Sequence, residues 1–166
     1  WRQKPTHTGQ RKETNVDVIT VRYNNLLGYA GLIPFILLPL LYVTPLLLSQ
    51  EQVLELYGLY SALILGFMAG VLWPVLHNQT PAPEKAWHLP LAAVMFPILS
   101  FIALLCAKPY FLPLQACLYV LLRLSEYRLG INRQYSKDYR ALRNQLTTVV
   151  LLSHLSLSWL VSMDTG

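Results

Sequence analysis

The chain contains a run of 24 residues, Leu26 to Ser49, without a single Asp, Glu, Lys or Arg. A helix of that length would be about 36 Å long, enough to cross a hydrocarbon core of about 30 Å with some tilt. Four more apolar stretches follow. Only 13% of the residues are charged, whereas a soluble domain usually has about 25%. The sequence therefore predicts an all-α integral membrane protein, with one helical domain over residues 26–163.

Five transmembrane helices are expected in this domain. Their expected bounds are 26–49, 54–76, 89–107, 110–130 and 146–163. The first contains Pro34, Pro39 and Pro45, and each proline predicts a kink because it removes a backbone donor. The fourth is purely apolar only as far as Leu122, so it must continue to Gly130, a plausible helix stop, to cross a bilayer.

The basic residues gather in the gaps that alternation of the helices places on one side. Residues 1–25, 77–88 and 123–145 hold twelve of the thirteen Lys and Arg, and the other side holds only Lys108. The positive-inside rule then puts the N-terminus inside and the C-terminus outside. We expect a multi-pass protein of a bacterial inner (plasma) membrane, or of the mitochondrial inner membrane if the chain is eukaryotic.

Residues 1–25 are expected to form a polar, basic arm on the cytoplasmic side, with a faint strand-like alternation at 15–23. The net charge of +5 does not indicate nucleic-acid binding, because the membrane accounts for basic residues in these gaps. Membrane lipids are therefore the expected partners of the basic face. Cys106 and Cys117 match no metal spacing and no disulfide framework, so no metal site is predicted.

A stripe of small residues lies on the expected second helix. Gly58, Ala62, Gly66 and Gly70 are each four residues apart and share one face of the helix. Small residues let another helix backbone approach closely. The stripe predicts helix packing, either within the bundle or between two copies of the chain.

His154 is the main candidate for chemistry, because it lies eight residues into the expected fifth helix. A neutral imidazole at that depth could contact haem, chlorophyll or quinone. Ser158 lies one turn away, and a histidine that simply bonds to a neighbouring helix fits equally well. No cofactor is predicted on this basis, and His154 with Ser158 stays a candidate ligand or pigment contact.

A second candidate lies near the inner end of the fourth helix. Arg123 and Glu126 are three residues apart and can pair on one helix face. In one interpretation the arginine reaches to the interface beside its partner. In the other, these two residues join Arg128, His77 and His88 in a pocket that could bind a lipid headgroup or phosphate.

Two stretches carry a family resemblance. Residues 27–35 read LGYAGLIPF, and residues 60–73 read YSALILGFMAGVLW. Together they resemble the DUF3429 family, bacterial inner-membrane proteins similar to the mitochondrial transmembrane protein 69. The resemblance covers roughly residues 26–163 and implies a helical membrane domain, but it implies no activity. In the family a polar residue, often His, usually precedes the tryptophan; Leu72 stands there in this chain.

The sequence contains no metalloprotease, nucleophile-elbow, phosphate-loop or paired-cysteine motif. We therefore expect a non-catalytic accessory or assembly subunit of a larger inner-membrane complex, respiratory or photosynthetic, with other membrane-protein subunits as partners. The alternative is a membrane protein or enzyme that binds a lipid, quinone or pigment.

Overall fold

The computed structural model describes residues 26, 28–45, 47–72, 88–133 and 135–164, and within them all regular structure is helical. The α-helices are α2 (Ile33–Val43), α3 (Gln50–Gly70), α5 (His88–Cys106), α6 (Phe111–Arg128) and α7 (Lys137–Asp164). Two 3-10 turns, η1 (Lys108–Tyr110) and η2 (Ile131–Arg133), precede α6 and α7. The predicted all-α fold class is confirmed. The arm predicted over residues 1–25 lies outside the described residues.

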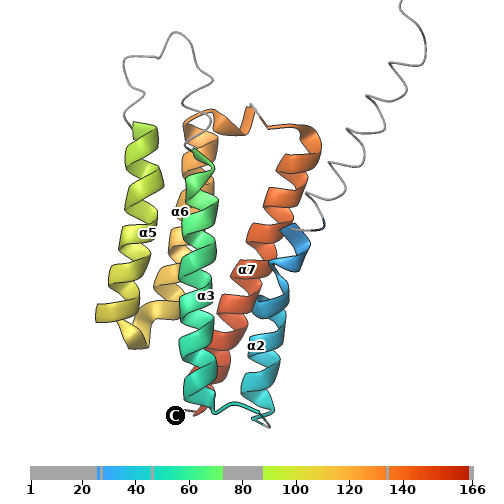
Figure 1. The fold of residues 1–166 in the computed structure, drawn as a ribbon, viewed down its shortest axis with the longest axis vertical. Helices are drawn as coiled ribbons and strands as arrows, with labels where there is room; N and C mark the ends of the chain where they lie inside the picture. The colour runs from blue at the N-terminus through green and yellow to red at the C-terminus, as the bar shows by residue number, and fades with distance from the viewer. Residues whose placement is uncertain (1–25, 27, 46, 73–87, 134, 165–166) are drawn as a thin grey trace, which may run out of the picture.

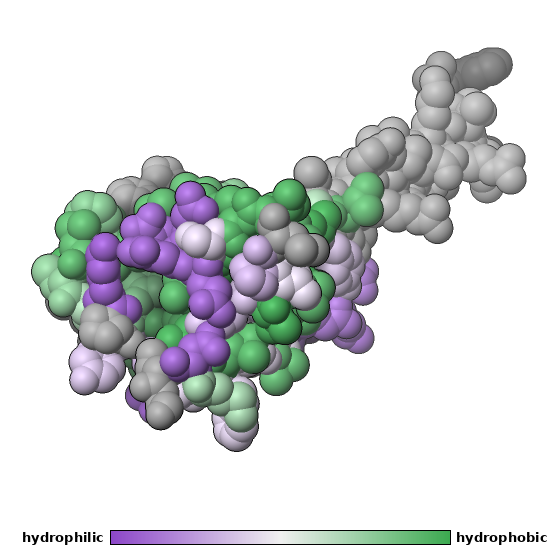
Figure 2. All heavy atoms as spheres, turned by 90° about the horizontal axis from the view of Figure 1, so that it is seen from below, coloured by the Kyte–Doolittle hydropathy of each residue, from purple (hydrophilic) through white to green (hydrophobic). Residues whose placement is uncertain are grey.

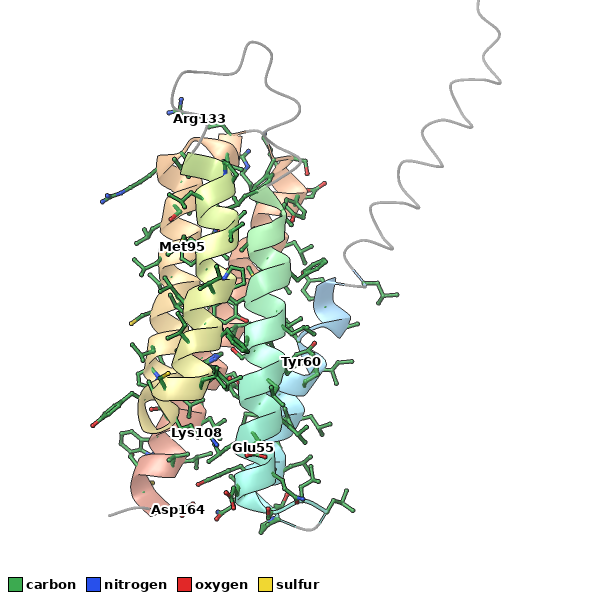
Figure 3. All side chains as sticks on the ribbon, turned by 60° about the vertical axis from the view of Figure 1, so that its left-hand side comes forward. Glu55, Tyr60, Met95, Lys108, Arg133 and Asp164 are labelled. Atoms are coloured by element: carbon green, nitrogen blue, oxygen red, sulfur yellow. The ribbon has the colours of Figure 1, made fainter. Side chains whose placement is uncertain are left out.

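The five helices form a bundle in which successive helices run in opposite directions (Figure 1). α3 contacts α2, α5 and α6, while α7 contacts α2 and α6. Arg133 lies at one end of the bundle, and Glu55, Lys108 and Asp164 lie toward the other (Figure 3). These ends are called the Arg133 end and the Asp164 end below.

The first helix is shorter than the predicted span 26–49. Residues 28–30 are helical, a turn follows at 31–32, and α2 then continues only to Val43. Of the three prolines predicted to kink the helix, only Pro39 lies in the middle of α2. Pro34 occupies the first turn, where its missing N–H costs nothing. Pro45 lies beyond the end, because a residue before proline disfavours the helical conformation.

Local signals set the other helix ends. Ser49 Oγ accepts the N–H of Gln52 at 3.3 Å, and the Gln52 side chain accepts the N–H of Ser49 at 3.0 Å. This capping box starts α3 four residues before the apolar run expected at 54. α6 ends at Arg128, and Gly130 follows in the left-handed conformation with φ of 74°. α7 begins nine residues earlier than the predicted span 146–163.

The outside of the bundle is largely apolar. Two helices, α3 and α7, are long and apolar enough to cross a membrane, and 28–43 and 90–106 form shorter apolar helices. Large apolar side chains are exposed on all five helices, among them Leu40, Phe67 and Trp159. Seen from the Asp164 end, hydrophilic residues gather there among apolar ones (Figure 2). These observations favour a bilayer environment for the helices.

The interior contains polar and charged groups as well as apolar ones. Its apolar core includes Phe35, Leu65, Leu122 and Leu157, contributed by α2, α3, α6 and α7. Between these side chains lie buried polar and charged residues: Ser61, Ser100, Gln115, Arg123, Glu126, Arg143, Thr147, Ser153 and His154. Buried polar groups are costly unless they are bonded to one another, so their partners decide what they can do.

Candidate functional site

Three charged side chains meet inside the bundle near the Arg133 end, and we call Arg123, Glu126 and Arg143 the charged cluster. Glu126 is fully buried and pairs with both arginines. Arg123 Nη1 donates to Glu126 Oε2, and Arg143 donates from Nε and Nη2 to the same carboxylate. The predicted Arg123–Glu126 pair is thus present, and Arg143 from α7 completes it as a triad.

The arginines also bind neutral acceptors. Arg123 donates to the side-chain oxygens of Asn132 and Asn144, at 3.0 Å from Nη2 to Asn132. Arg143 Nη2 donates to the carbonyl of Met68 at 2.9 Å, near the end of α3. The cluster therefore connects three helices, α3, α6 and α7. Two guanidinium groups and one carboxylate leave it with one excess positive charge.

Tyr135 lies beside this cluster, before α7 begins. The guanidinium of Arg143 lies 6.0 Å from the centre of its ring. Its buried hydroxyl has no hydrogen-bond partner among the described residues. Burial, with the nearby carboxylate of Glu126, raises the pKa of Tyr135 to about 12, so this phenol stays neutral at physiological pH.

Of the other residues predicted for this pocket, Arg128 is not among the hydrogen-bond or ion-pair partners of the charged cluster. Arg128 is exposed at the end of α6. His88 is the first residue of α5, and His77 lies outside the described residues.

Arg143 is the member of the charged cluster that was not predicted from the sequence. As one of six basic residues in 123–145, it counted as a loop residue facing the inner aqueous side. In the structure it lies six residues inside α7 and is 3% exposed. The signal that could have found it is spacing: Arg143, Thr147, Val150, His154 and Leu157 follow at intervals of four and three, and all are buried.

A second buried group surrounds His154, and we call His154, Tyr57, Ser61, Ser153 and Tyr119 the neutral cluster. His154 is 1% exposed. Its Nδ1 lies 2.8 Å from the carbonyl of Val150 and 3.0 Å from the hydroxyl of Tyr57. Its Nε2 lies 2.9 Å from Ser61 Oγ. The rings of Tyr57 and Tyr119 pack against the imidazole, with centroids 5.0 and 5.6 Å away.

The hydrogen-bond partners of the His154 ring determine which of its two nitrogens carries the proton. A carbonyl can only accept, so Nδ1 carries the proton and donates to Val150, and Nε2 accepts from the Ser61 hydroxyl. The hydroxyl of Tyr57 is then free to donate to Ser153 Oγ, at 2.9 Å, and Ser153 donates to the carbonyl of Phe35. Each donor in this series of hydrogen bonds has an acceptor.

Tyr119 completes the neutral cluster by donating to the carbonyl of Ser61 at 2.9 Å. Ser158, the predicted companion of His154, is half-buried and is not among the hydrogen-bond partners of the ring. In the described part of the chain, no group of three His, Cys, Asp or Glu is placed to hold a metal ion. The neutral cluster therefore has the form of an internal support that joins α2, α3, α6 and α7.

The small-residue stripe of α3 lies against α5 over part of its length. A Cβ atom at Gly58 would lie 2.9 Å from Leu104 and 3.4 Å from Phe111, and one at Gly66 would lie 3.5 Å from Pro97. Ala62, between these two glycines, is half-buried. A Cβ at Gly70 would meet no atom within 4 Å among the described residues. Gly58 and Gly66 thus serve packing within the bundle.

Comparison with known proteins gives a match to a family model. No curated protein and no solved structure matches the chain. A family model described as a protein of unknown function, DUF3429, matches residues 21–159. Leu72, which stands where the resemblance implied a polar residue, is fully buried in the apolar core. The match spans most of the 166 residues, and the chain therefore belongs to the DUF3429 family.

Proposed function

We propose that this protein crosses an inner membrane five times and serves there as a non-catalytic accessory or assembly subunit of a larger complex. The observation that carries the proposal is that the ring of His154 and the carboxylate of Glu126 are both occupied by internal bonds, while the outer faces are apolar. The described helices thus offer apolar surfaces on which other membrane proteins could pack.

The lengths of α5 and α6 support crossings in addition to those of α3 and α7. α5 has 19 residues and α6 has 18, which corresponds to about 27 to 29 Å and is close to the hydrocarbon thickness of a bilayer. The charged cluster lies in the last turns of α6, toward the Arg133 end. There the guanidinium groups are near an interface, where buried charge is less costly than at the bilayer centre.

The charge at the two ends supports the orientation. Arg128, Arg133, Lys137 and Arg140 lie at or near the Arg133 end, whereas Lys108 lies toward the Asp164 end beside Glu55. The positive-inside rule then assigns the Arg133 end to the cytoplasm, or to the matrix in a mitochondrion. The N-terminus is inside and the C-terminus is outside in this arrangement.

A respiratory or photosynthetic complex is a suitable host by analogy, because such complexes contain small helical subunits. The alternative role, binding of a pigment or quinone through His154, has less support. A ligand at Nε2 would have to displace the hydroxyl of Ser61 from a site that is 1% exposed.

Cysteine labelling tests the membrane arrangement. In a chain whose cysteines are replaced by serine, C106S and C117S, single cysteines are introduced by Arg133→Cys or Lys108→Cys. A membrane-impermeant maleimide should label K108C in right-side-out vesicles and R133C in inverted vesicles. Equal labelling of the two variants in one vesicle orientation would contradict the orientation.

Purification of the tagged full chain from its native membrane in a mild detergent tests the subunit role. Mass spectrometry should find other membrane-protein chains at a fixed ratio to this one. A chain that migrates alone, and binds no other chain after cross-linking in intact membranes, would overturn the subunit role without affecting the five-span arrangement.

A further inference from the structure

A cavity of about 330 Å³ lies between α2, α3 and α7, on the side of the bundle toward the Arg133 end. Its walls are mainly apolar and include Phe35, Ile64 and Leu146. Phe67, which is 75% exposed, also lines it, so the cavity opens on the outer surface. A volume of this size is at the lower end of the range for ligand-binding pockets.

The cavity extends along α7. Its lining on α7 runs from Tyr139 to Val150, which corresponds to about 16 Å along the helix. An apolar space of this form is a poor host for water, because water needs polar partners, but it suits a hydrocarbon chain. The polar lining, Tyr139 and Arg143, lies toward the start of α7, and the apolar remainder extends toward the middle of the bundle.

The positive charge of Arg143, at the end of the cavity near the start of α7, favours an anionic ligand. Arg143 belongs to the charged cluster, which has two guanidinium groups for one carboxylate and so one excess positive charge. Its bonds to described residues use Nε and Nη2, which leaves Nη1 for another acceptor. An anion beside Arg143 would compensate the excess positive charge of the cluster, which is costly to leave uncompensated in a buried position.

We propose that this cavity binds a single-chain amphiphile with an acidic head group, a carboxylate or a phosphate monoester, taken from the surrounding bilayer. The chain lies along the walls formed by Phe35, Ile64 and Leu146, and the head group lies against Arg143 and Tyr139. The proposal rests on the membrane placement of the bundle but not on the subunit role, so the two can fail separately.

Photo-crosslinking in the full chain tests the site. The protein is reconstituted in nanodiscs of zwitterionic lipid with a fatty acid that carries a diazirine in its chain, and the adducts are mapped by mass spectrometry. They should concentrate in 28–35, 64–71 and 139–150. Oleate and lysophosphatidic acid should compete at least tenfold better than oleyl alcohol, and inorganic phosphate should not compete.

A matched pair of variants tests the cavity itself. Ile64→Trp places a large ring in the cavity and should reduce labelling at least tenfold. Leu63→Trp adds the same ring to the next residue of α3, which is 69% exposed and does not line the cavity, and should leave labelling unchanged. Far-UV circular dichroism of both variants should match that of the parent.

The preference for an acidic head group is measured by competition on the unaltered protein, so it does not depend on an Arg143 variant that could fail to fold. Equal competition by oleate and oleyl alcohol would overturn the proposal. Labelling that is spread evenly over the outer helix faces, or that persists in I64W, would also overturn it. Neither result would alter the cysteine accessibility of R133C and K108C.

Discussion

The charged cluster and the neutral cluster place different kinds of polar group in the interior of the bundle. Both bury polar groups where several helices meet, and both include residues of α7, Arg143 and His154. These residues are eleven positions apart, or about 16 Å along the helix. The cluster near the Arg133 end uses full charges, whereas the one deeper in the bundle uses hydroxyls and a neutral imidazole. The difference agrees with the lower cost of burying charge near an end of the bundle than in its middle.

The two clusters also differ in how each member depends on the others. Glu126 satisfies two arginines at once, so the loss of one carboxylate leaves both guanidinium groups without their anion. In the neutral cluster each hydroxyl donates one bond to the next acceptor, and several acceptors are backbone carbonyls such as those of Phe35 and Ser61. The loss of one member there leaves most of the bonds in place.

The largest expected effect is that of Glu126→Gln. Removing the carboxylate leaves two buried positive charges unpaired, which should lower the free energy of unfolding by about 3–5 kcal/mol. Reversible unfolding in mixed detergent and SDS micelles, followed by circular dichroism, would measure this loss. The matched control is Glu55→Gln: its pair with Lys108 is 4.0 Å long and exposed, and it should contribute less than about 1 kcal/mol. Equal losses in the two variants would show that the charged cluster is not the stronger element.

A smaller loss is expected for His154→Leu. The substitution keeps an apolar side chain in the core but leaves the hydroxyl of Ser61 without its acceptor, at a cost of about 1–3 kcal/mol. The same unfolding measurement, with Ser158→Ala as the control on the same helix, would check it. Ser158 is half-buried and not bonded to the ring, so its change should stay within about 0.5 kcal/mol. A loss in H154L as large as that in E126Q would remove the distinction between the clusters.

The smallest effect belongs to Tyr57→Phe. Without this hydroxyl, Ser153 still donates to Phe35 and Nδ1 of His154 still donates to Val150, so no donor is stranded. The expected loss is about 1 kcal/mol. Tyr110→Phe is the control, because Tyr110 is 68% exposed, and its unfolding free energy should not change. A loss of several kcal/mol in Y57F would mean that the neutral cluster depends on every member.

The features that could be predicted from the sequence are those that depend on composition and on the spacing of nearby residues. The apolar stretches predicted an all-α chain, and the interval of three residues predicted that Arg123 and Glu126 could pair. The resemblance to the DUF3429 family is confirmed by the family match over residues 21–159. These features depend on residues close together in the chain, which explains why they could be read from it.

Contacts between residues far apart in the chain could not be predicted from the sequence. The role of Arg143 depends on where α7 begins, and the apolar run alone placed that start nine residues too late. Two partners of His154, Tyr57 and Ser61, come from α3, 97 and 93 positions away, and no local pattern specifies them. The first helix was predicted too long, because its apolar composition continues past Val43 into a segment where Pro45 ends the helix.

The position of α7 in the chain has a consequence for biosynthesis. α7 is made after the other four helices, yet it supplies Arg143 to one cluster and His154 to the other. Until α7 packs against the earlier helices, the carboxylate of Glu126 lacks one of its two arginines, and the hydroxyls of Tyr57 and Ser61 lack their acceptors on α7. The earlier helices therefore remain an incomplete bundle, and the packing of α7 completes both clusters.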